Sequence, residues 1–109
     1  MLEATRYSLA GLAAAAREEE AFRLELAAAA LLVPAGLLLG ASGLERALLV
    51  GSVLLVLLVE LVNSALEATV DRVSLEEHSL AKRAKDMSSA AVMLALVNAG
   101  VVWLLVLFT

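Results

Sequence analysis

Cysteine is absent from this chain of 109 residues, and aromatic side chains make up only 4% of it. Without cysteine, the protein has neither disulfide bonds nor thiol chemistry. Positive charge is also scarce, since 8 lysines and arginines stand against 12 aspartates and glutamates, for a net charge of −4. No nucleic-acid partner is therefore expected, because such partners require a basic surface.

The amino-terminal segment also lacks the features of a secretory signal. Residues 1–20 carry an acid at Glu3, contain no compact apolar core, and end in the charged residues 17–20. What the chain has in abundance is apolar side chains: 62% of its residues are hydrophobic, and the mean hydropathy is +0.94. That is too apolar for an ordinary soluble domain. We expect one membrane domain over residues 1–109, with the apolar runs retained in the mature protein.

The hydropathy pattern predicts an all-α membrane protein with three spanning helices. Residues 26–44 and 87–109 contain no charge and are long enough to cross the hydrocarbon core. Residues 47–71 form the remaining span, and residues 72–86 form a polar loop that leads into the first turns of a helix. Leucines and alanines share one broad face of residues 1–20, which indicates an amphipathic helix on the membrane surface. A frayed, alanine-rich terminus is the alternative for this segment.

Basic residues are distributed unevenly between the two sides of these spans. The side that holds the amino terminus and the polar loop carries most of them: Arg6, Arg17, Arg23, Arg72, Lys82, Arg83 and Lys85. The opposite side of the membrane has only Arg46. Because lysine and arginine are retained on the cytoplasmic side, the amino terminus and the loop are predicted to be cytoplasmic.

A row of polar residues occupies one face of the second predicted span. Glu60, Asn63, Glu67 and Asp71, here called the acidic stripe, are spaced three, four and four residues apart. At about 100° per residue they fall within an arc of roughly 80° on one helix face. Ionisable side chains inside a membrane are costly, so such a stripe indicates a functional site.

The predicted orientation brings further charged residues to the same cytoplasmic interface. Glu25 and one of the glutamates at 18–20 join Glu67 and Asp71 there, beside the basic residues of the loop. Carboxylates beside cations suit Mg²⁺ with a phosphate substrate, and phosphoryl transfer needs a metal clamp, positive charge and a base. Glu60 is the candidate base, because it is the carboxylate deepest in the apolar span and could meet a hydroxyl presented from the lipid.

Two other interpretations stay open at this point. The stripe could bond neighbouring helices in a non-enzymatic membrane assembly protein, or it could conduct ions. An ion pathway needs acids through the whole bilayer, and the outer halves of the predicted spans hold none. No Walker A or G-x-G-x-x-G sequence occurs, so a nucleotide site would not be of a standard kind.

Three segments of the chain resemble motifs of the prokaryotic diacylglycerol kinase family. VELVNSALEATVDR at residues 59–72 resembles its E-x-x-N-[ST]-A-x-E-x-x-x-D signature. HSLAKRAKDMSSAAV at residues 78–92 resembles its A-K-D motif, and EEEAFRLE at residues 18–25 its first acidic motif. The similarity runs without gaps from residue 7 to residue 103.

The resemblance implies a small kinase of the bacterial inner membrane with a surface helix, three spans and a cytoplasmic amino terminus. It implies a homotrimer whose sites are shared between subunits. It also implies Mg²⁺-dependent transfer of the ATP γ-phosphate to diacylglycerol or a related lipid alcohol, which yields phosphatidic acid.

The resemblance further implies a role for individual positions. Glu60 matches the catalytic base, and Glu19 and Glu67 match the metal ligands. The nucleotide positions are Tyr7, Glu19, Glu67, Glu76, His78, Lys85 and Asp86. The lipid-side or interfacial positions are Arg23, Glu25, Arg46, Glu60, Ser89 and Trp103. Asn63 and Asp71 belong to the signature and support the site.

The chain also departs from the family pattern. Three successive glutamates begin the first acidic motif, and Glu19 is taken as the metal ligand because Phe22 and Arg23 set the frame. Leu9 stands where relatives often have tryptophan. Some members of the family phosphorylate undecaprenol instead, but residues 63–65 and 86–89 look more like the diacylglycerol branch.

Overall fold

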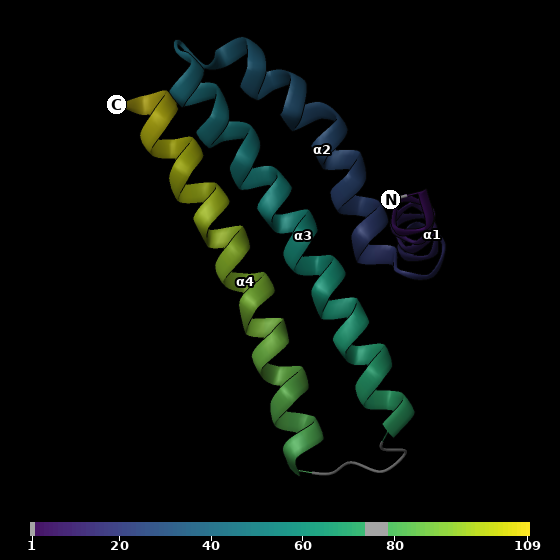
Figure 1. Ribbon diagram of the computed structural model, residues 1–109. Helices are drawn as coiled ribbons and strands as arrows, with labels where there is room; N and C mark the ends of the chain where they lie inside the picture. The colour runs from purple at the N-terminus through teal and green to yellow at the C-terminus, as the bar shows by residue number, and fades with distance from the viewer. Residues whose placement is uncertain (1, 74–78) are drawn as a thin grey trace.

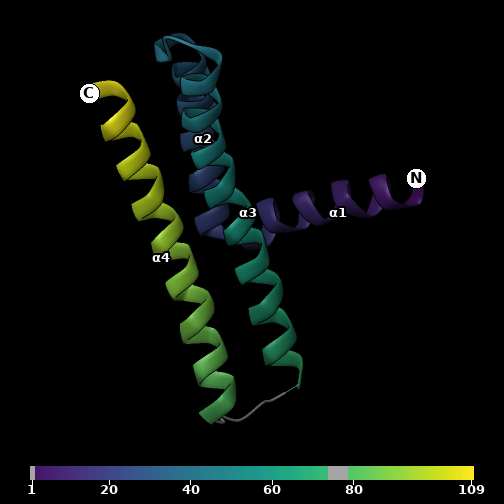
Figure 2. The same ribbon diagram turned by 60° about the vertical axis from the view of Figure 1, so that its left-hand side comes forward.

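The computed structural model describes residues 2–73 and 79–109, and these ranges are helical almost throughout. The helices are α1 (Leu2–Glu18), α2 (Glu20–Leu39), α3 (Gly43–Val73) and α4 (Ser79–Phe108). Helices α2, α3 and α4 run side by side with α3 in the middle, while α1 projects sideways from the bundle near the start of α2 (Figure 1, Figure 2). The predicted all-α fold is confirmed.

Helices α2, α3 and α4 are each long and apolar enough to cross a membrane, with mean hydropathies of 1.8, 2.2 and 2.5 over an 18-residue stretch of each. Little of this apolar surface is covered within the chain: the buried residues of α4 amount to Ala95 among those described. Many large apolar side chains of the three helices are exposed, as expected for helices surrounded by lipid or by other copies of the chain. The prediction of three spans after an amino-terminal helix is confirmed.

The helix boundaries differ from those expected from hydropathy. Helix α2 begins at Glu20, six residues before the predicted first span, and α4 begins at Ser79, so the helical turns expected before the last span cover residues 79–86. Hydropathy marks where a chain meets lipid, whereas helix formation requires only favourable backbone and side-chain interactions. Lysine, arginine and alanine favour helices, and an ion pair between Lys82 and Asp86, four residues apart, supports the first turns of α4.

The turn between α2 and α3 is closed by reciprocal capping bonds. Ser42 Oγ accepts a hydrogen bond from the Glu45 backbone N–H at 3.1 Å, and Glu45 Oε1 accepts one from the Ala41 N–H at 3.0 Å. A Cβ atom on Gly40 would lie 2.6 Å from Cγ and 2.9 Å from the backbone nitrogen of Arg46, so only glycine fits there. These contacts explain why the helix stops at Leu39 and not at residue 44.

At the end of the bundle near this turn, a cluster of contacts joins three helices. Trp103 of α4 donates its indole N–H to the Leu49 carbonyl and to Ser52 Oγ of α3, each at 3.2 Å. A Cβ atom on Gly36 of α2 would lie 3.1 Å from Leu49 Cβ, and Leu49 itself is completely buried. Helices α2 and α4 are therefore held against α3 at the end away from the acidic stripe.

Candidate active site

The acidic stripe lies on the carboxyl-terminal half of α3. Because α3 is one continuous helix, its four residues share a face as predicted. Glu60 is only 6% exposed, Asn63 and Glu67 are half-buried, and Asp71 is exposed. The stripe therefore runs from the interior of the bundle to its surface.

The corner between α1 and α2 brings Glu19 to this stripe. Glu19 is the N-cap residue of α2 and has extended backbone angles (φ −113°, ψ 109°), which breaks the helix and sends α1 sideways. Its carboxylate and that of Glu67 both interact electrostatically with Glu60. Glu19 is half-buried, whereas Glu18 and Glu20 are exposed. This burial supports Glu19 as the metal-binding member of the three glutamates.

Arg23 stabilises the same corner. Its guanidinium Nη1 donates to the Ala16 carbonyl at 3.0 Å and to the Arg17 carbonyl at 2.9 Å, at the end of α1. These are carbonyls that a helix end leaves without a helical partner, and a cation there is also favoured by the helix dipole. Arg23, which the resemblance places at a lipid-side or interfacial position, therefore caps α1 in this structure.

Glu25 joins the group from α2. Its carboxylate interacts electrostatically with that of Glu60, and its Oε2 is shielded from solvent without a hydrogen-bond partner among the described residues. It faces a cavity of about 110 Å³ whose walls include Val56 and Leu96. We call Glu19, Glu25, Glu60 and Glu67 the acid cluster, since their electrostatic interactions all converge on Glu60.

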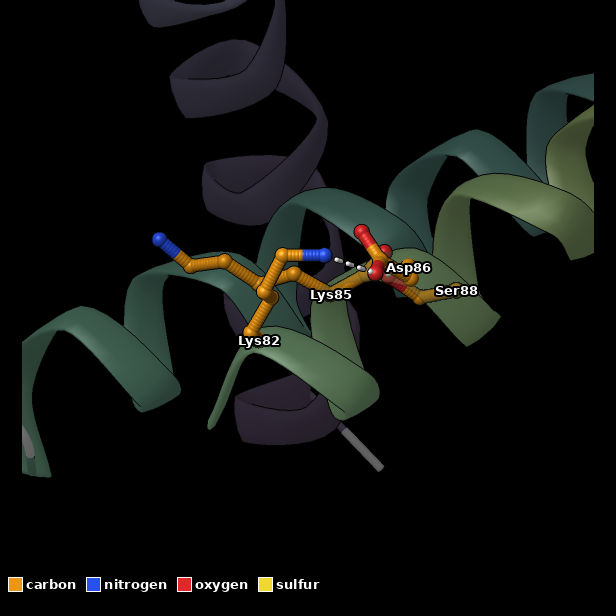
Figure 3. A network of polar contacts seen from close by, with 4 residues as sticks. All are labelled: Lys82, Lys85, Asp86 and Ser88. Carbon is orange, nitrogen blue, oxygen red and sulfur yellow. Dashed lines mark hydrogen bonds and ion pairs between the residues drawn. The ribbon is translucent and has the colours of Figure 1, made fainter. Parts of the chain in front are cut away.

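Helix α4 supplies the positive charge and a chain of hydrogen bonds. Lys85 forms an ion pair with Asp71 on α3. Lys82 reaches toward Asp86 on its own helix at 2.8 Å (Figure 3). One turn beyond Lys85 along α4, Ser88 Oγ is 2.6 Å from Asn63 Oδ1. Lys85 therefore places a positive charge at the exposed end of the stripe.

An apolar cleft of about 630 Å³ opens between α1 and α3 beside the acid cluster. Glu18 and Glu19 contribute the carboxylates of its lining. The other lining residues are mostly small or aliphatic: Ser8, Gly11, Leu12, Ala14, Ala15, Leu61, Ser64, Ala65 and Ala68. A polar end beside an apolar wall suits an amphipathic ligand.

Within a single chain, several of the predicted site residues lie away from the acid cluster. Arg46 lies in the first turns of α3, fourteen residues from Glu60, a separation of roughly 20 Å along the helix. Trp103 is engaged with Leu49 and Ser52 and lies near that same end. Tyr7 is 71% exposed on α1, which projects away from the bundle (Figure 2).

Of the remaining predicted residues, two are described by the structure and two are not. Ser89 is exposed on α4, and Asp86 is paired with Lys82. Glu76 and His78 lie outside the described residues. Sequence reasoning did not select Ser88, although its position three residues after Lys85 places the two on one helix face and could have drawn attention to it.

The carboxylates of the acid cluster fit a metal ion that arrives bound to a nucleotide better than they fit a free metal ion. Within residues 2–73 and 79–109, no three histidine or acidic side chains gather closely enough to hold a metal by themselves. Mg²⁺ in kinases is usually bound by one or two carboxylates together with substrate phosphates. Glu19 and Glu67, which both interact electrostatically with Glu60, can supply such a pair.

These features define a membrane protein with three spans and an acidic site, flanked by lysines, at one end of its bundle.

The sequence profile described as prokaryotic diacylglycerol kinase matches residues 6–107. The chain is 54% identical to the diacylglycerol kinase of Pseudomonas aeruginosa over 107 residues, which covers 98% of this chain and 87% of the relative. It is 46% identical to that of Haemophilus influenzae over 108 residues, or 99% of this chain and 92% of the relative. It is 45% identical to that of Escherichia coli over all of this chain and 89% of the relative. The chain belongs to the prokaryotic diacylglycerol kinase family.

Proposed function

We propose that this protein transfers the γ-phosphate of ATP to the free hydroxyl of diacylglycerol, which yields phosphatidic acid and ADP. The observation that carries the proposal is that the acid cluster adjoins an apolar cleft, which Glu19 lines, and that Lys85 is paired with Asp71 at the exposed end of the stripe. Family membership supports the same activity, since the relatives named above are diacylglycerol kinases.

Glu60 acts as the general base in this proposal. It is the most buried carboxylate of the acid cluster, and it takes the proton of the acceptor hydroxyl. The hydroxyl oxygen then forms a bond to the γ-phosphorus, while the bond from that phosphorus to the β-γ bridging oxygen breaks and ADP leaves. The acceptor must therefore reach Glu60 from the side of the lipid.

Glu19 and Glu67 hold Mg²⁺ together with the nucleotide phosphates. When bound there, the ion neutralises negative charge on the transferring group. Lys85 and Asp86 lie on the first turns of α4 and contribute to binding the nucleotide. Asn63 donates a hydrogen bond from Nδ2 to Glu67 Oε1 at 3.3 Å, which holds the carboxylate in place.

The cleft between α1 and α3 receives the acceptor lipid. Its small side chains leave room for a glycerol backbone, and Glu19, which lines the cleft, is an electrostatic neighbour of Glu60. The acyl chains remain in the bilayer, so the protein scarcely contacts them. We therefore expect weak dependence on chain length and stronger discrimination at the head region, where a wrong substrate leaves buried polar groups unpaired.

ATP enters this site from the cytoplasm. The excess of lysine and arginine at the amino terminus and around residues 72–85 supports a cytoplasmic location for both segments. In sealed membrane vesicles, ATP added outside should be used when the vesicles are inverted and not when they are right side out. The opposite result would reverse the proposed orientation.

A homotrimer with sites shared between subunits completes the proposal. Its support is that Tyr7 stands apart from the acid cluster and that α4 leaves most of its surface uncovered. The number three comes from the family resemblance. Native mass spectrometry in mild detergent should give a mass of three chains, and finding only monomers at concentrations where the protein is active would contradict this prediction.

The activity is tested by competition between two lipids. Diacylglycerol and undecaprenol at equal mole fraction in mixed micelles are supplied with labelled ATP, with and without Mg²⁺. We expect most of the label in phosphatidic acid, and only when Mg²⁺ is present. Label mainly in undecaprenyl phosphate would place the chain in the other branch of the family. No labelled lipid at all would favour the non-enzymatic assembly protein.

A further inference from the structure

Ser88 is the polar contact between α4 and the stripe residue Asn63. Its Oγ lies 2.6 Å from Asn63 Oδ1 and 3.1 Å from the carbonyl oxygen of Lys85. Asn63 Nδ2 in turn lies 3.3 Å from Glu67 Oε1. Ser88, Asn63 and Glu67 are all half-buried, so these bonds are only partly exposed to competition from water.

The direction of this chain of hydrogen bonds follows from the available protons. An ionised carboxylate can only accept, so the amide must present its NH₂ group to Glu67 and its oxygen to Ser88. Both contacts of the serine hydroxyl are then to acceptors, and its single proton is best donated to the closer one, Asn63 Oδ1. Ser88 thus holds the oxygen of the Asn63 amide, while the NH₂ group of the same amide donates to Glu67.

We propose that Ser88 is a positioning residue for the magnesium–nucleotide site and acts through Asn63 on Glu67. This inference rests on the proposed function of Glu67 as a metal ligand. With one oxygen of Glu67 held by Asn63, the other is directed to the metal. Without the hydroxyl of Ser88, the Asn63 amide loses its bond to α4, so the amide and the Glu67 carboxylate that it holds are freer to rotate.

The ion pair between Lys85 of α4 and Asp71 of α3 does not hold the Asn63 amide in this way. The Lys85–Asp71 pair is exposed, with side-chain exposures of 41% and 63%, and exposed pairs hold geometry weakly. Asp71 lies four residues beyond Glu67 and makes no bond to Asn63 among the described residues. Among the described contacts, the bond that fixes the Asn63 amide to α4 is therefore the one from Ser88.

The test compares Ser88→Ala with Ser88→Thr, which keeps the hydroxyl. The magnesium concentration for half-maximal kinase activity should rise about tenfold in Ser88→Ala, as is typical when the partner of a metal ligand is lost, and Ser88→Thr should restore most of it. The concentration of diacylglycerol for half-maximal activity should stay unchanged. Thr69→Val is the matched control, because the Thr69 hydroxyl bonds only to the Ala65 carbonyl of its own helix in the described contacts.

A second measurement does not require activity. Binding of Mn²⁺ in the presence of a non-hydrolysable ATP analogue, followed by electron paramagnetic resonance, should weaken by a similar factor in Ser88→Ala. In an Asn63→Ala background, Ser88→Ala should add no further loss, because its effect passes through Asn63.

Three results would overturn the inference. The first is a Ser88→Ala protein with wild-type metal titrations. The second is an undiminished effect of Ser88→Ala in the Asn63→Ala background. The third is an equal loss of metal and diacylglycerol affinity, which would indicate general disruption of the site. A wild-type protein without Mg²⁺-dependent ATP turnover would instead overturn the proposed function, and the role of Ser88 with it.

Discussion

Replacement of Glu60 by glutamine should lower lipid phosphorylation by about 100-fold or more, while the protein still inserts into membranes and assembles. Glutamine has nearly the same size as glutamate and can still form hydrogen bonds, but it cannot take up the proton of the acceptor hydroxyl. Glu60 is 6% exposed and lies where the electrostatic interactions of the acid cluster converge, so no other carboxylate is equally placed to replace it.

The measurement is the initial rate of label transfer from ATP to diacylglycerol at saturating concentrations of both, with assembly followed by native mass spectrometry. Glu20→Gln is the matched control, because it makes the same chemical change at an exposed position. If Glu60→Gln retained more than about a tenth of the wild-type rate, a general-base role for Glu60 would be untenable.

Replacement of Glu19 or Glu67 by glutamine should raise the magnesium concentration needed for half-maximal activity by at least about tenfold in each case. Each change removes one charged oxygen ligand of a metal that holds few protein ligands. The requirement for ATP should rise with that for the metal, because the two bind together. The requirement for diacylglycerol should change much less.

Glu18→Gln and Glu20→Gln are the controls within the same charged run, and both should titrate like wild type, since both side chains are exposed. If Glu20→Gln instead behaved as expected for Glu19→Gln, the frame at the start of α2 would be displaced by one residue. Wild-type metal titrations in Glu19→Gln and Glu67→Gln, combined with weaker lipid binding, would show that the metal and lipid positions had been exchanged.

The same variants separate the kinase from a non-enzymatic assembly protein. If Glu60 and Glu67 served only to join helices, their glutamine variants would keep the hydrogen bonds and assemble normally, with no change in any metal requirement. A shift in magnesium dependence without a change in assembly is the result that the kinase predicts. The two readouts therefore need to be recorded on the same preparations.

Much of the architecture could be predicted from the sequence, because it depends on interactions that are local along the chain. Charge-free runs of sufficient length specify the spans, since every backbone group in lipid must bond within its own helix. The spacing of Glu60, Asn63, Glu67 and Asp71 places them on one face of any helix, whatever surrounds it. The motifs they form also led to the family.

Other features depend on how the helices pack, and the sequence left them open or led to a different expectation. Hydropathy placed the last span at residues 87–109, and the structure shows where its helix begins, at Ser79, because charged residues can be helical outside the lipid. The resemblance placed Arg23 and Trp103 at lipid-side or interfacial positions. The structure adds that the Arg23 guanidinium caps α1 and that the Trp103 indole N–H bonds to acceptors on α3.

The sequence by itself determined the number of spans, the face that carries the acids, and the family. Only the tertiary structure decided which of three adjacent glutamates turns toward Glu60, because that choice depends on the break between α1 and α2 at Glu19. Only the structure showed that Ser88 meets Asn63, since residues 25 positions apart on different helices are brought together by packing. Periodicity fixes where a side chain lies on its own helix, but the rotation and crossing of neighbouring helices decide what that side chain touches.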